Sequence, residues 1–87
     1  MTLYKFLDDE ELCLTVRRSP QPKNTFSASI EDVFLIEGSS GIHFYGYGQT
    51  YEEAVRNYLS KIEGKKLEHY ASDYLTREVF VPSALTF

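Results

Sequence analysis

Apolar and polar residues alternate over much of the first half of this chain, and a period of two is typical of half-buried strands. The first alternating segment is "LCLTVRR" (residues 12–18), with three aliphatic side chains on one side. The following "SPQPKN" (residues 19–24) predicts a turn or loop, because its two prolines offer no backbone amide donors.

The second alternating segment is "TFSASIEDVFLIE" (residues 25–37). Phe26, Ala28 and Ile30 share one side, and the other side carries Ser27, Ser29 and Glu31. The alternation breaks at Asp32, where a run of apolar residues begins. A bulge or bend near residues 31–32 would account for this change of phase.

A third strand is predicted at "IHFYGYG" (residues 42–48), after a turn at "GSSG" (residues 38–41). Ile42 and Phe44 lie on one face of this strand and would contact a helix. The opposite face then carries three ring side chains, which are His43, Tyr45 and Tyr47. Gly46 and Gly48 allow a bend and let a helix begin close to the sheet.

A helix is predicted directly after this strand. Thr50 is the expected N-cap, and Glu53 stands three residues later, which is the spacing of a capping box. An apolar stripe at helical spacing follows, formed by Ala54, Val55, Tyr58, Leu59 and Ile62. Gly64 is expected to end the helix in a left-handed conformation.

The two ends of the chain have weaker patterns. At the start, "LYKFL" is a short apolar opening, and the acidic run of residues 8–11 is interpreted either as a solvated turn or as an acidic patch. After the helix, "KLEHYA" and "REVFVP" could be strands, with a turn or one helical turn at "SDYLT" between them. The last five residues either fray or pack Phe87 against the body.

These elements predict one α+β domain over residues 1–87. Its architecture would be a three-stranded antiparallel meander, one amphipathic helix packed on one face, and one or two further strands. A helix lying on one face of a sheet buries both apolar stripes.

Composition narrows the classes of function. The 87 residues carry a net charge of −4, which argues against a nucleic-acid binder and permits a basic protein partner. One cysteine and two histidines cannot form a standard zinc site within the chain, and no motif predicts a cofactor. No apolar run approaches the roughly 20 residues of a membrane span, and the acidic start differs from a signal peptide. We therefore expect a soluble protein of the cytoplasm.

The face opposite the predicted helix is the candidate binding surface. Tyrosine and arginine are enriched at the centres of protein interfaces. The candidate partner-binding residues are Arg17, His43, Tyr45, Tyr47 and Tyr51. The alternative interpretation is that tyrosine only serves strand packing.

The same region raises two chemical possibilities, phosphate binding and RNA cleavage. Phosphate binding at "GYGQT" lacks the lysine of a phosphate loop, and Glu52 and Glu53 would repel an anion. "GIHFYG" resembles a stretch of HicA-type RNA-cleaving toxins in which a strand-borne histidine is catalytic, and this would imply a nuclease using His43. The scattered titratable residues indicate no catalytic group, so we expect a protein that is not an enzyme.

The strand-to-helix junction resembles the corresponding segment of HicB-type antitoxin domains. The matching residues are Gly46, Gly48, Thr50, Glu52, Glu53, Ala54 and Asn57. That resemblance implies a partial ferredoxin-like fold of the order strand–strand–strand–helix–strand. It also implies an antitoxin role, in which the domain masks a small basic toxin.

Most of the chain is also similar to a loose set of small proteins encoded by bacteriophages and prophages. The shared stretches are "FLDD" (residues 6–9), residues 46–67, and a closing segment with Arg77, Glu78, Val81 and Pro82. This resemblance implies a phage accessory protein in the bacterial host cell, one that inhibits a host defence system such as CRISPR-Cas. Free edge strands leave a homodimer open.

Overall fold

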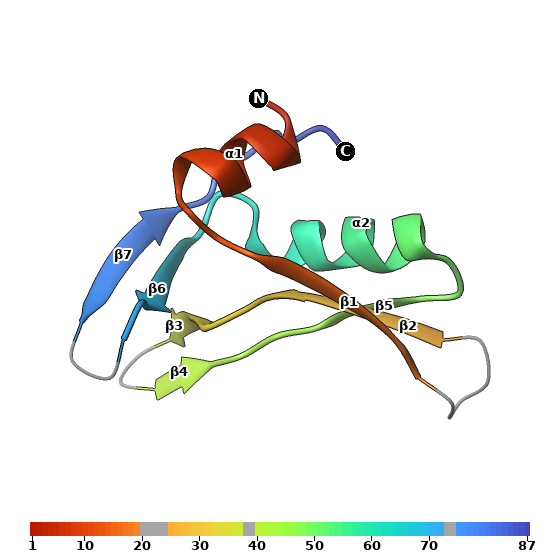
Figure 1. Cartoon of the computed structure of the whole chain (residues 1–87), viewed down its shortest axis with the longest axis horizontal. Helices are drawn as coiled ribbons and strands as arrows, with labels where there is room; N and C mark the ends of the chain where they lie inside the picture. The colour runs from red at the N-terminus through yellow and green to blue at the C-terminus, as the bar shows by residue number, and fades with distance from the viewer. Residues whose placement is uncertain (20–24, 38–39, 73–74) are drawn as a thin grey trace.

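The computed structural model describes residues 1–19, 25–37, 40–72 and 75–87. Within these ranges, two helices and seven strands follow one another (Figure 1). Their bounds are α1 Leu3–Asp9, β1 Leu14–Ser19, β2 Thr25–Ile30, β3 Val33–Glu37, β4 Ser40–Ile42, β5 Gly46–Gly48, α2 Tyr51–Ile62, β6 Lys66–Tyr70 and β7 Thr76–Phe80. All strand pairs are antiparallel, so the predicted α+β class is confirmed.

The first sheet has the order β1-β2-β5, and α2 lies across one of its faces (Figure 1). Ala28 and Ile30 of β2 are buried on the side of the helix, as the alternation predicts. The five residues of the predicted apolar stripe are the buried residues of α2. Thr50 caps this helix, since its hydroxyl accepts a hydrogen bond of 3.1 Å from the Glu53 amide, and Gly64 follows it with a φ of +71°.

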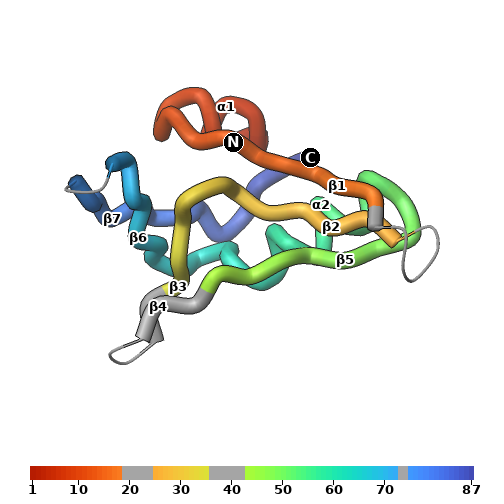
Figure 2. Tube along the Cα trace, turned by 60° about the horizontal axis from the view of Figure 1, so that its bottom comes forward, coloured from red at the N-terminus to blue at the C-terminus, as the bar shows by residue number. Residues whose placement is uncertain are grey.

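The expected bend at residues 31–32 is present. Asp32 has a φ of +60°, in the left-handed region, and the chain turns sharply there from β2 into β3 (Figure 2). Two backbone hydrogen bonds hold the bend, from the Glu31 amide to the Cys13 carbonyl and from the Tyr70 amide to the Asp32 carbonyl, both 2.8 Å long. The bend carries the chain out of the first sheet and into a second one.

The second sheet has the order β4-β3-β6-β7. The predicted third strand is therefore divided: β4 pairs with β3 in the second sheet, and β5 pairs with β2 in the first. Both segments expected after the helix are strands, β6 and β7, and they pair with each other. The expected turns at residues 19–24, 38–41 and 72–76 fall partly outside the described residues, as does the side chain of Ile42.

The start of the chain differs from the prediction, because the apolar opening and the first two acidic residues form α1. Thr2 caps this helix by accepting a hydrogen bond from the Lys5 amide. Leu3, Phe6 and Leu7 are buried on one side of the helix. A turn is found only after residue 9, where Glu11 adopts a φ of +54°.

The C-terminal residues pack against the body, which confirms one of the two alternatives for Phe87. The Leu3 amide donates to the Thr86 carbonyl over 2.8 Å, so both ends of the chain lie side by side (Figure 1). The ring of Phe87 stacks on Tyr51 at 6.1 Å between centroids. One hydrophobic cluster contains buried residues from both helices and both sheets.

Candidate functional site

The face of the first sheet that points away from α2, called here the outer face, carries polar and aromatic side chains in rows across the strands. Arg17, Ser27 and Tyr47 form one such row, because Arg17 pairs with Ser27 and Ser27 pairs with Tyr47. Thr15 and Ser29 begin the next row. In these two rows the central strand contributes only serines, and the neighbouring strands contribute longer side chains.

Five rings cross the outer face and continue onto the second sheet, and we call them the aromatic row. They are Tyr70, Phe34, His43, Tyr45 and Tyr47. Successive centroids are 5.0, 5.7, 4.8 and 6.2 Å apart, within the range of favourable aromatic pairs. The side chains of Tyr45 and Tyr47 remain 42% and 55% exposed.

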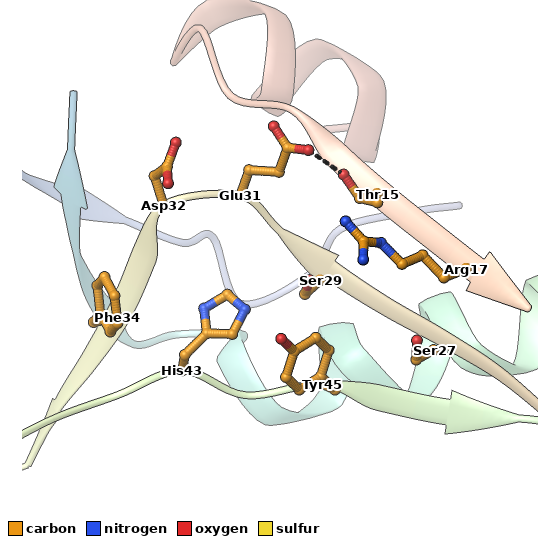
Figure 3. A pocket seen from close by; sticks show the side chains of 9 residues that line it. All are labelled: Thr15, Arg17, Ser27, Ser29, Glu31, Asp32, Phe34, His43 and Tyr45. Carbon is orange, nitrogen blue, oxygen red and sulfur yellow. Dashed lines mark hydrogen bonds between the residues drawn. The ribbon is translucent and has the colours of Figure 1, made fainter. Parts of the chain in front are cut away.

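A pocket of about 400 Å³ opens on the outer face beside the bend (Figure 3). It lies where the bend turns β3 away from β2, next to Ser27 and Ser29 of β2. The residues that line it are Thr15, Arg17, Ser27, Ser29, Glu31, Asp32, Phe34, His43 and Tyr45. Aromatic side chains, two carboxylates and one guanidinium therefore border the same space.

Hydrogen bonds orient two of the pocket residues. Thr15 donates its hydroxyl hydrogen to a Glu31 carboxylate oxygen over 2.7 Å. His43 Nδ1 lies 2.9 Å from the Val33 carbonyl oxygen, which fixes the imidazole over the pocket floor. Arg17 and the Asp32 carboxylate make no ion pair with any described residue, and both line the pocket.

Helix α2 fixes the edge strand that carries the tyrosines. Asn57 Nδ2 donates to the Tyr47 carbonyl over 2.5 Å, and Lys61 Nζ donates to the Tyr45 carbonyl over 2.6 Å. Gly46 and Gly48 point at the helix: a Cβ on Gly46 would lie 2.2 Å from the Tyr58 amide nitrogen. The glycines therefore serve close packing, and the residues between and before them point outward.

The structure brings together four of the five predicted partner-binding residues. Arg17, His43, Tyr45 and Tyr47 all lie on the outer face, and three of them line the pocket. Tyr51 lies apart from them, at the first turn of α2, where it stacks on Phe87. Burial, together with the neighbouring Tyr4, raises the pKa of Tyr51.

The predicted partner-binding residues did not include Phe34, Tyr70 or the two carboxylates of the bend, Glu31 and Asp32. The run of apolar residues after Asp32 did not show which of them point outward. Once Asp32 is placed in a left-handed turn, a period of two from Val33 assigns Phe34 to the outer face. Tyr70 then follows, because its strand pairs with β3.

Among the described residues, no three histidine, cysteine or acidic side chains are arranged to hold a metal ion. Neither helix in this part of the chain has the length and apolar character that a membrane span requires. A scan against protein-family models found no match, and searches of the curated proteins and of the solved structures also returned none.

Proposed function

We propose that this protein is a non-enzymatic binding module that holds a protein partner on its outer face. The observation that carries the proposal is the aromatic row, whose two tyrosines on the first sheet stay about half exposed on a face that α2 does not cover. Exposed tyrosines beside an arginine are typical of interface centres, because tyrosine offers rigid contact area and a hydroxyl group.

The charges of the outer face favour a protein over a nucleic acid. Stacked rings and an arginine could also hold single-stranded bases. However, Glu31 and Asp32 line the same pocket, and the chain as a whole carries a net charge of −4. Carboxylates at this position would repel a phosphate backbone, whereas they attract a basic protein surface.

His43 supports a second candidate, an RNA-cleaving enzyme, because the pocket places it near carboxylates and an arginine. Its Nδ1 is occupied by the Val33 carbonyl, which leaves only Nε2 for proton transfer. Replacement of His43 by alanine tests this candidate: unchanged RNA integrity and an unchanged phenotype in expressing cells would exclude the nuclease.

The resemblances to phage proteins and to HicB-type domains suggest two kinds of protein partner. Similarity to phage proteins supports a host defence protein as the target, and a plaque count on cells with an active defence system measures its inhibition. Similarity to HicB-type domains supports a small basic toxin instead, which would be encoded by a neighbouring gene. Both partners would present basic surfaces to the outer face.

Affinity capture from a bacterial lysate tests the proposal. The wild-type protein is expected to retain a specific protein, and a Tyr45→Ala/Tyr47→Ala double variant is expected to lose it by at least tenfold, since two central aromatic anchors are removed. Tyr4→Ala is the matched control, because Tyr4 is an exposed tyrosine of α1. Equal retention by all three proteins would contradict the proposal.

A further inference from the structure

We infer that the end of the pocket at the bend receives the guanidinium group of a partner arginine. This inference rests on the proposed function and specifies it: the outer face recognises a basic protein by inserting one of its arginines between the bend carboxylates and the rings. The groups that support it come from β1, β2 and β3, from the bend between β2 and β3, and from the segment between β4 and β5 that carries His43 and Tyr45.

Two carboxylates supply the negative charge. Glu31 is oriented by Thr15, which occupies one oxygen and leaves the other open. Asp32 is held by its left-handed backbone and by the Tyr70 amide, while its carboxylate makes no ion pair with a described residue. A guanidinium donates several hydrogen bonds in a fixed plane, and both carboxylates line the pocket in which it would bind.

His43 adds an acceptor. A carbonyl oxygen can only accept, so the hydrogen shared with Val33 belongs to Nδ1. In the neutral imidazole, Nε2 is then an acceptor, and Figure 3 shows the ring directed toward the pocket. Ser29, which is 7% exposed, also lines the pocket and places a hydroxyl group in it.

The walls of the pocket favour a planar cation. Phe34 and His43 stand 5.7 Å apart with their planes tilted by 59°, and Tyr45 meets His43 edge-on at 4.8 Å. A guanidinium stacks on aromatic faces and is less strongly hydrated than an ammonium. Arginine therefore fits this end of the pocket better than lysine.

Arg17 limits where the cation can bind. Its guanidinium points into the pocket from β1, on the side away from Phe34 (Figure 3). Repulsion between like charges keeps a partner arginine at the bend. This predicts opposite effects for two variants: neutralising Asp32 weakens arginine binding, and neutralising Arg17 strengthens it.

The test is an NMR titration of the labelled protein with acetyl-arginine amide. Chemical shifts are expected to move at residues 29–34 and 43–45. The uncharged isostere acetyl-citrulline amide and the anionic acetyl-glutamate amide are expected to leave them in place. Asp32→Asn, which tolerates the same left-handed backbone, is expected to weaken arginine binding about tenfold, the value of one charge-assisted contact. Arg17→Gln is expected to strengthen it.

Glu52→Gln, which removes an exposed charge on α2, is the control and should leave the affinity unchanged. Absent shifts, equal shifts with citrulline, preferred binding of glutamate, or full affinity in Asp32→Asn would each overturn the inference. A different result would distinguish the proposed binding function from the inferred arginine site. If capture of a partner depended on Tyr45 and Tyr47 but not on Asp32, the proposed binding function would stand and the inferred arginine site would be refuted.

Discussion

At the scale of single residues, the acidic residues Glu11 and Asp32 both have a left-handed backbone conformation, for different reasons. Asp32 at the bend has a short polar side chain that tolerates this region, and it separates the two sheets. Glu11 lies at the residue after the α1 cap. The Glu11 amide donates to the Asp8 carbonyl and the Leu12 amide to the Leu7 carbonyl, which is the Schellman pattern.

Glycine is the usual residue at the position of Glu11, so Glu11→Gly is expected to stabilise the protein. Glycine removes the strain of the left-handed conformation, and this gain exceeds the entropic cost of a more flexible unfolded chain. The free energy of unfolding is therefore expected to rise by about 0.5 kcal/mol. Thermal unfolding measures this as a rise of about 3 °C in the midpoint. Glu63→Gly is the control, because Glu63 ends α2 with a φ of −56° and is under no such strain. A lower midpoint in both variants would refute the explanation.

Arg77 joins the end of α1 to the second sheet, and its neighbour His69 makes the fold sensitive to pH. Arg77 forms an ion pair of 2.9 Å with Glu10 and donates from Nε to His69 Nδ1 over 3.2 Å. Burial, and then the charge of Arg77, lower the pKa of His69 below 6.5. Protonation would remove the acceptor that Arg77 uses.

Because the native state disfavours the protonated form, the free energy of unfolding is expected to fall as the pH drops through 6.5 toward the lowered native pKa. Above that window this contribution is fully present. Urea unfolding of the wild type and His69→Gln at about pH 7.5 and about pH 5.5 measures the effect. Between these two pH values, the wild type should lose more free energy of unfolding than the variant. Equal losses would show that groups other than His69 cause the pH dependence.

At the scale of elements, the packing of α2 on β5 depends on the absence of side chains at two positions. A Cβ on Gly46 would approach Tyr58 and Ala54 backbone atoms at 2.2 to 2.5 Å, and one on Gly48 would approach Ala54 at 2.6 Å. Backbone atoms cannot move aside without shifting the whole helix.

Gly46→Ala is therefore expected to destabilise the protein by about 3 kcal/mol, the upper end of ordinary overpacking costs. Denaturant unfolding gives this value directly. Tyr47→Ala changes the adjacent residue, which points outward, and should cost much less. If Gly46→Ala changed the free energy of unfolding by less than about 0.5 kcal/mol, the contact between α2 and β5 would be looser than these distances indicate.

How well the sequence predicts each element depends on how local its cause is. Alternation in β1 and β2, the cap at Thr50 and the stripe of α2 are set by neighbouring residues, and all were predicted correctly. Helix α1 was missed because seven residues make a weak periodic signal and because an acidic run is also typical of turns. The division of the third strand depends on pairing with two different sheets, which no local pattern shows.

At the scale of the whole molecule, the outer face could be predicted in part. The period of two placed Arg17, His43, Tyr45 and Tyr47 on a common face, and the structure brings them together there. The pocket could not be predicted, because it depends on the angle between two sheets joined at Asp32. Tyr51 was predicted to belong to the same surface, but it lies at the start of α2, where it stacks on Phe87.

The central claim is that the outer face, and not α2, meets the partner. A photo-crosslinking residue placed at position 47 in one variant and at position 56 in another tests it most directly in bacterial cells. Both positions are exposed, the first on the outer face and the second on α2. The account predicts a specific crosslinked protein from position 47 and none from position 56. A crosslink from position 56 alone, or from neither position, would contradict it.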